Sequence, residues 1–100
     1  MENQHRQISG YRELNQIEID LMNEIKAAGQ ALEQLCDKVR FHVTTQYQIA
    51  SNGHSEGISD TPEMDRLARA QPETWEGWGR SNFQSGLMYL TRAVAQPGGF

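Results

Sequence analysis

The longest uninterrupted helical signal in this sequence runs from Tyr11 to Ile49, a stretch with no proline and a single glycine, Gly29. Within it, apolar residues recur at alternating steps of four and three, as on one face of an α-helix: Leu21, Ile25, Ala28, Leu32, Leu35 and Val39. A neighbouring stripe widens this face and consists of Met22, Cys36, Val43 and Tyr47. The pattern therefore predicts one long helix over 11–50 that packs against two apolar neighbours.

Turn-forming residues divide the rest of the chain. Residues 51–60 hold two glycines and three serines, which is loop composition. Asp60 stands two residues before Pro62, as at many helix starts, and Pro72 interrupts the helical stretch that follows. No segment alternates with period two, so we predict an all-α fold, an antiparallel helical hairpin in a single domain. Its elements are an arm or short helix over 1–9 hinged at Gly10, the long helix, a loop over 51–60, a short helix over 61–70 and a last helix over 72–96.

The last helix also carries two apolar stripes. One consists of Phe83, Leu87, Leu90 and Val94, and the other of Trp75, Trp78, Tyr89 and Ala93. Two antiparallel helices bury only the faces that they turn toward each other, so a hairpin leaves apolar surface for a further partner. We therefore expect a homo-oligomer built from two-fold dimers of hairpins. The alternative is a monomer in which the N-terminal arm and the 61–70 helix fold back over the hairpin.

The charge balance and the cysteine count exclude several classes of protein. Nine Lys and Arg residues face thirteen Asp and Glu residues, a net charge of −4, so the molecule is not a general binder of polymeric nucleic acid. A single cysteine closes no disulfide within the chain, and the polar N-terminus resembles neither a signal peptide nor a membrane span. These features predict a protein of a reducing cytoplasm with no membrane partner.

The sequence gives no support to catalysis or to a metal site. His5, His42, His54 and Cys36 are too scattered for a zinc pattern, and Cys36 lies on an apolar stripe as a small buried hydrophobe. His42 lies on the same predicted helix, and we expect it to be a partly buried polar residue. Phosphate-binding glycine loops and nucleophile motifs are lacking. We predict a protein that is not an enzyme, with no cofactor and no metal.

Two residues suit an anionic ligand with flat rings. Tyr11 offers a face on which a base can stack, and Lys26 offers a point charge for a phosphate. On one continuous helix they would lie roughly 22 Å apart, too far to share a ligand within one chain, but two antiparallel copies could bring them together. The alternative is an aromatic residue that packs at the helix start and a solvated lysine. For Arg80 we expect a salt bridge to Glu76, and for Gly86 a close approach of two helices.

Three segments of the sequence form a recognisable pattern over roughly residues 1–35 and 73–97. Their residues are Asn3-Gln4-His5-Arg6, Ile8, Gly10-Tyr11-Arg12 and Leu14; then Glu18-Ile19, Leu21-Met22-Asn23 and Ile25-Lys26; then Gly79-Arg80, Gln84, Gly86, Met88, Leu90 and Arg92-Ala93-Val94-Ala95-Gln96-Pro97. This pattern resembles the phage family of anti-CBASS cyclic-nucleotide sponges, whose helical hairpin is related to that of anti-Thoeris sponges. CBASS is a bacterial anti-phage defence that signals through cyclic nucleotides.

The resemblance implies a compact hexamer of hairpins that captures cyclic dinucleotides such as 3′,3′-cyclic GMP-AMP without degrading them, in the cytoplasm of the infected bacterium. The family's dinucleotide-site tyrosine and lysine match Tyr11 and Lys26, and Arg12 stands beside them. Some members also bind cyclic trinucleotides of the cyclic tri-adenylate kind. For such a second site the candidates here are Arg66, Arg69 and Arg80.

A competing interpretation is a small helical phage regulator. It would dock the aromatic surface around Trp75 and Trp78 on a host protein. It predicts protein partners and no change of melting temperature with nucleotides.

Overall fold

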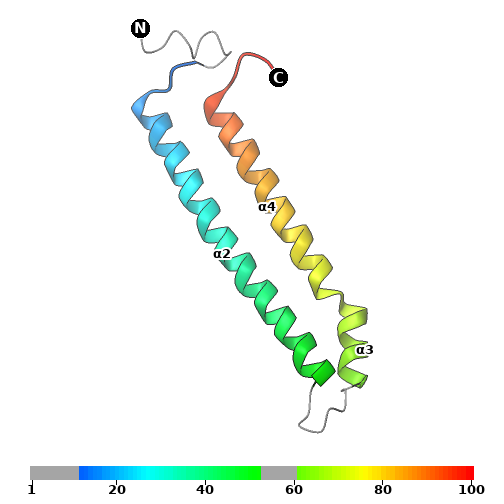
Figure 1. The fold of residues 1–100 in the computed structure, drawn as a ribbon. Coiled ribbons are helices and arrows are strands. Elements are labelled where there is room, and N and C mark those ends of the chain that lie inside the picture. Colours follow the sequence, from blue (N-terminus) through cyan, green and yellow to red (C-terminus); the bar gives the residue numbers. More distant parts are fainter. Residues whose placement is uncertain (1–11, 53–60) are drawn as a thin grey trace. The chain divides into compact units, whose positions relative to one another are not determined.

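All regular secondary structure in the described part of the chain is helical. The computed structural model describes residues 12–52 and 61–100. It contains α2 (Gln16–Asn52), α3 (Thr61–Ala70) and α4 (Pro72–Ala95), with no strand among the described residues (Figure 1). The predicted all-α class is therefore confirmed. The arm predicted over 1–9 and the loop residues 53–60 lie outside the described residues.

The long helix begins later than the apolar pattern predicts. Residues 12–15 are not helical, and α2 starts at Gln16 because Asn15 and Glu18 cap it reciprocally. The Glu18 amide donates to Asn15 Oδ1, and the Asn15 amide donates to Glu18 Oε1, each at 2.9 Å. Such side chains satisfy first-turn amides that have no partner within the helix. The predicted start at residue 11 is therefore wrong for residues 12–15.

Loss of this cap is expected to destabilise the protein. Asn15→Ala should lower the free energy of unfolding by about 0.5–2 kcal/mol, because the Glu18 amide loses its side-chain acceptor. The measurement is urea unfolding at a fixed protein concentration. Asn23→Ala is the matched control, since Asn23 lies exposed inside α2 and alanine has the higher helix propensity. A loss of equal size in both variants would contradict the cap.

Gln71 forms the break between α3 and α4. It has a left-handed backbone with φ 51°, and its amide donates to the Leu67 carbonyl oxygen at 2.9 Å. The Gln71 carbonyl oxygen in turn accepts from the Thr74 amide at 3.0 Å, so one residue ends α3 and starts α4. Pro72 then occupies the first position of α4, where no amide hydrogen is needed.

The other two helix ends differ slightly from the predicted bounds. α4 ends at Ala95 rather than at residue 96, because Gln96 turns left-handed with φ 48° and donates its amide to the Arg92 carbonyl oxygen at 2.8 Å. α2 continues to Asn52, two residues into the predicted loop. The Ser51 hydroxyl lies 3.3 Å from the Gln48 carbonyl oxygen and bonds back to the last turn of α2.

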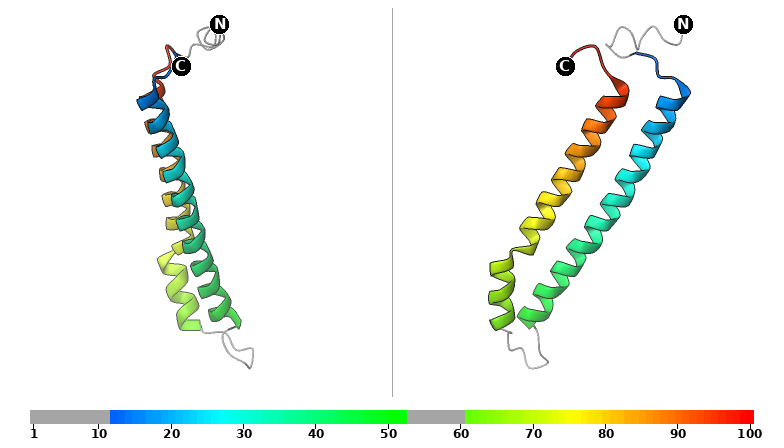
Figure 2. Two further views of the ribbon diagram at one scale, coloured as in Figure 1. Left: turned by 90° about the vertical axis from the view of Figure 1, so that its left-hand side faces the viewer. Right: turned by 180° about the vertical axis from the view of Figure 1, so that it is seen from behind.

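The described residues form two compact units, and α2 and α4 contribute to both. The first unit holds residues 12–31 and 82–100, in which the beginning of α2 lies beside the end of α4 (Figure 2). A Cβ atom on Gly29 would lie 3.2 Å from Leu87 Cδ1, so the glycine lets the two helices approach. None of the described residues of this unit is buried.

The second unit contains the buried core. It holds residues 32–52 and 61–81, and its buried side chains are Cys36, Val43, Ala50 and Leu67. Tyr47 joins all three helices here, because its hydroxyl donates to Glu73 Oε2 at 2.8 Å and lies 3.4 Å from the Leu67 carbonyl oxygen. α3 thus packs on α2, as the monomeric alternative requires, whereas the arm required by that alternative is not described.

Many large apolar side chains remain exposed in both units. In the first unit they are Ile17, Ile19, Leu21, Phe83, Met88, Tyr89, Leu90 and Phe100, and in the second Leu35, Val39, Phe41, Ile49, Trp75 and Trp78. α2 buries the stripe of Cys36 and Val43, while Leu35 and Val39 of the regular four-and-three stripe stay exposed. A substantial apolar surface is therefore left for a partner.

Two smaller expectations are wrong within the described residues. Apart from its chain neighbours and the nearby backbone of α4, no described atom lies within 4 Å of a Cβ placed on Gly86, and the close helix approach is made by Gly29 instead. His42 is exposed rather than partly buried. The expected burial of Cys36 is confirmed at 6% exposure.

Candidate functional site

Lys26 is a positively charged residue on the surface of the first unit. It is exposed on α2 and makes no hydrogen bond or ion pair with any described residue. A lysine ammonium group is a compact point charge of the kind that binds phosphates. Tyr11, the proposed stacking residue, lies outside the described residues.

Arg12, in contrast, is committed to partners within the chain. Its Nη1 donates to Glu18 Oε1 at 3.1 Å, its Nη2 pairs with Glu18 Oε2, and the same Nη2 donates to the Val94 carbonyl oxygen at 2.7 Å. The hydrogen bond with Glu18 raises the pKa of Arg12. Hydrogen bonds from Arg12 and from the Asn15 backbone lower the pKa of Glu18. Both groups are therefore charged at neutral pH.

The first unit does not bring Arg12 and Lys26 into contact. Arg12 is held at Glu18, and Lys26 lies eight residues further along α2, which is about 12 Å of helix rise. The estimated distance between Tyr11 and Lys26 assumed a helix from residue 11, whereas residues 12–15 are not helical. A meeting of Tyr11 and Lys26 from different copies of the chain stays a prediction.

The three candidate arginines of the second site lie in the second unit and differ in their partners. Arg66 pairs with Glu63 through two hydrogen bonds of 2.6 and 2.8 Å. Arg80 donates to Glu76 at 3.0 Å, which confirms the expected salt bridge. Only Arg69 is exposed without a hydrogen bond or ion pair among the described residues. No interaction among the described residues gathers the three arginines into one cluster.

An ion-pair chain crosses the second unit from α2 to α4. Arg80 also donates to Asp37 at 2.9 Å, and Arg40 donates to Glu76 at 2.9 Å. Glu76 thus bridges two arginines, and its side chain is only 5% exposed. The roles of Asp37 and Arg40 escaped the sequence analysis because their partners lie 43 and 36 residues away along the chain.

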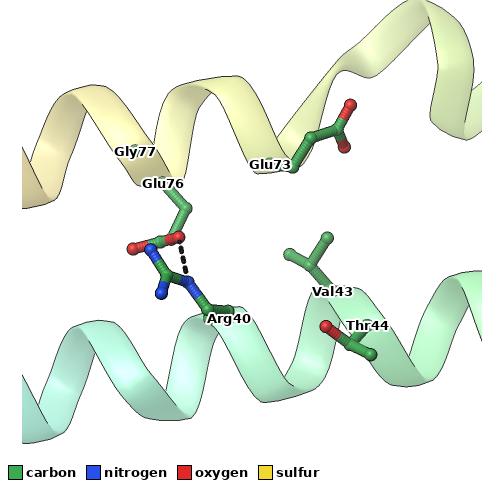
Figure 3. A pocket seen from close by; sticks show the side chains of 6 residues that line it. All are labelled: Arg40, Val43, Thr44, Glu73, Glu76 and Gly77. Atoms are coloured by element: carbon green, nitrogen blue, oxygen red, sulfur yellow. Dashed lines mark hydrogen bonds and ion pairs between the residues drawn. The ribbon is translucent and has the colours of Figure 1, made fainter.

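A cavity of about 270 Å³ lies beside this chain of charges. It is lined by Arg40, Val43, Thr44, Glu73, Glu76 and Gly77, and Figure 3 shows Arg40 and Glu76 pointing toward each other from opposite helices. Glu76 already binds the Arg40 guanidinium, and the Glu73 carboxylate accepts from Tyr47. The cavity is lined by two carboxylates and by one arginine that already pairs with Glu76. The negative charge would repel a phosphate ligand.

Glu76 should make the second unit sensitive to acid. Hydrogen bonds from Arg40 and then Arg80 outweigh desolvation and lower its pKa below the ordinary 4.5 in the folded protein. The stability that ionised Glu76 contributes is therefore complete above about pH 4.5 and is lost as the pH falls through the lower folded pKa. We expect the urea midpoint to fall as the pH is lowered from about 4.5 through this lower folded pKa. Glu76→Gln should lower the midpoint at about pH 7 and flatten the acid decline, and an unchanged decline would contradict this role.

The described residues offer neither a metal site nor a membrane span. They contain no group of three His, Cys, Asp or Glu side chains that could hold a metal ion. No helix in the described ranges is long and apolar enough to cross a membrane.

Comparison with known proteins identifies the family. No protein-family model matches the chain. A protein of Pseudomonas phage JBD67 that bears the name anti-CBASS protein 2 is 36% identical over 107 aligned positions, which take in 99% of each chain. Similarity of this degree over the whole of both chains is that of two members of one family. The chain therefore belongs to the family of the phage anti-CBASS protein 2, as its motifs indicate.

Proposed function

We propose that this protein blocks CBASS defence in the infected bacterial cell by sequestering cyclic oligonucleotide signals, without catalysis. The observation that carries the proposal is the full-length similarity to a protein named for its action against CBASS. The exposed Lys26 ammonium supports it, because a cyclic dinucleotide bears two phosphate charges. In this proposal Tyr11 stacks on a base, Lys26 binds a phosphate, and Arg12 serves the same site.

The pocket is proposed to form between copies of the chain. The first unit has no buried residue in its described part, while Ile17, Met88 and Tyr89 are 72%, 69% and 72% exposed. An apolar surface of this kind is stabilised when a second copy covers it. A homo-oligomer, a hexamer by the resemblance of the motifs, would complete the core and place Tyr11 of one copy beside Lys26 of another.

Sequestration acts by mass action. The protein must be abundant, and its dissociation constant must lie below the signal concentration that activates the bacterial effector. Because binding alone removes the signal, neither turnover nor a cofactor is required. A cyclic dinucleotide such as 3′,3′-cyclic GMP-AMP is the first ligand to test.

A second site for cyclic trinucleotides would depend most on Arg69. Arg69 has no partner among the described residues, whereas Arg66 and Arg80 would have to share the carboxylates that they already bind. Arg69→Ala should therefore weaken the binding of cyclic tri-adenylate more than Arg66→Ala does.

Calorimetry with a panel of cyclic dinucleotides and cyclic trinucleotides tests the proposed function. We expect saturable binding of at least one compound and, by light scattering, the mass of an oligomer. If no compound binds at concentrations up to about 100 μM, an affinity already too weak for a sponge, sequestration is excluded.

The exposed tryptophans favour a second candidate function, docking on a host protein. Trp75 and Trp78 are 63% and 55% exposed, and their rings meet edge to face with centroids 4.8 Å apart. Aromatic residues, tryptophan among them, are enriched at protein–protein interfaces. This candidate requires a host protein that is retained by the wild type and lost with Trp75→Ala, and no nucleotide-dependent shift of the melting temperature.

A further inference from the structure

The Arg12 side chain links the segment that precedes α2 with the last turn of α4. Its guanidinium spans both carboxylate oxygens of Glu18 and also donates to the Val94 carbonyl oxygen at 2.7 Å. Val94 lies in the last turn of α4, where carbonyl oxygens lack helical donors and a cation is favourable. The three residues belong to the same compact unit, and we name them the Arg12 clamp.

The clamp leaves Arg12 little to offer a ligand. Nη1 and Nη2 are already engaged, and Nε is buried without a hydrogen-bond partner in the described part of the chain. The neighbouring Glu18 carboxylate also neutralises the charge that would attract a phosphate. Lys26, which bonds to no carboxylate or other group in the described ranges 12–52 and 61–100, is the better phosphate ligand.

We infer that Arg12 and Glu18 are positioning residues, which act on the ligand through Tyr11 rather than by touching it. Tyr11 precedes Arg12 in the sequence, and the clamp holds the Arg12 side chain at Glu18 and at the Val94 carbonyl oxygen. The inference rests on the proposed function, since it specifies how the dinucleotide site is held.

The clamp matters because the first helical hydrogen bond of α2 is accepted by the Asn15 carbonyl oxygen, from the Ile19 amide at 2.9 Å, and residues 12–14 lie before it. Residues 12–15 precede α2, and the Arg12 side chain ties the start of this segment to Glu18 and to the Val94 carbonyl oxygen. A segment that is ordered before binding spares the ligand the entropy of ordering it. The Arg12 side chain is 37% exposed, so the pair with Glu18 adds little to overall stability and chiefly restricts geometry.

Glu18 has two functions that substitutions can separate. It accepts from the Asn15 amide as part of the cap, and it binds Arg12. Glu18→Gln keeps an oxygen that can accept from Asn15 but removes the charge that holds Arg12. Asn15→Ala does the reverse, because it weakens the cap and leaves the Arg12 clamp intact.

The test is the calorimetric affinity for 3′,3′-cyclic GMP-AMP in a double-mutant cycle. We expect Glu18→Gln and Arg12→Gln each to weaken binding by roughly tenfold, the effect of ordering a short segment on binding. Asn15→Ala should lower the melting temperature but change the affinity less than twofold. In a Tyr11→Leu background, which retains an apolar side chain and measurable binding, Glu18→Gln should add no further loss, since it acts through the tyrosine.

The outcomes separate this inference from the proposed function. Suppose that the wild type binds the ligand and that Arg12→Gln weakens binding equally in the wild-type and the Tyr11→Leu backgrounds. Arg12 then contacts the ligand itself, and the inference is wrong. Unchanged affinity in both clamp variants also overturns it. Failure of the wild type to bind any cyclic nucleotide overturns the proposed function as well.

Discussion

Lys26→Ala is expected to weaken the binding of 3′,3′-cyclic GMP-AMP by roughly 30-fold or more, the usual result of removing one partner of an enclosed charge pair. Lys26 is exposed on α2, and no described carboxylate pairs with it, so its ammonium is free to meet a ligand phosphate. A pocket enclosed by copies of the chain would exclude water and strengthen this contact. Calorimetry at one fixed ionic strength measures the loss, because salt screens charges that stay exposed.

Lys38→Ala is the matched control for this prediction. Lys38 is the only other lysine of the chain, it also lies exposed on α2, and it likewise has no partner among the described residues. Both variants remove one positive charge, but only Lys26 matches the motif of the dinucleotide site. The Lys38 variant should bind within about twofold of the wild type. Equal weakening in the two variants would mean that the ligand responds to net charge and not to a site at Lys26.

Leu67→Ala should produce the largest loss of stability, about 2–5 kcal/mol. Leu67 is 1% exposed and is the one large side chain that is fully buried among the described residues. It lies on α3 in the second unit, close to Tyr47, so its removal leaves a cavity where α3 packs on α2. Such a loss is a large share of the 5–15 kcal/mol that ordinarily stabilises a small domain. Urea unfolding at a fixed protein concentration measures it.

The control for this substitution is Leu67→Met. Methionine has a similar volume and can adapt to the same space, so this variant should lose less than about 1.5 kcal/mol. If the alanine variant unfolds at the same urea concentration as the wild type, Leu67 does not anchor α3.

The helices and their approximate positions could be predicted because the sequence signals that start and end a helix are local. The break at Pro72 and the start near Asp60 each depend on residues that lie next to each other in sequence. The start of α2 was predictable too: Asn15 and Glu18 stand three apart, the spacing of a capping box, but the apolar pattern obscured them.

The apolar face that α2 buries could not be predicted from periodicity. The two stripes differ only by a rotation of the helix, and both contain medium-sized apolar residues. The structure buries Cys36 and Val43 and leaves Leu35 and Val39 exposed. Only the position of the facing helix decides between them, and that depends on the whole hairpin.

Which cations are available to a ligand could not be predicted either. Arg12 and Lys26 both match the family motif, yet Arg12 binds Glu18 and a carbonyl oxygen 82 residues away, while Lys26 has no described partner. Arg80 and Arg69 differ in the same way, because Asp37 reaches Arg80 from another helix. Contacts between segments distant in sequence decide which charges are free.

The central claim is that the protein holds the signal without consuming it, and ligand recovery tests this directly. The wild type is mixed with 3′,3′-cyclic GMP-AMP and filtered through a membrane that retains the protein, and the free ligand is measured by chromatography. We predict that the amount of free ligand in the filtrate falls in a fixed molar ratio to the protein added. Heat denaturation of the protein should then release the ligand chemically unchanged. Ligand that stays in the filtrate at every protein concentration, or returns as a linear or hydrolysed product, would contradict sequestration.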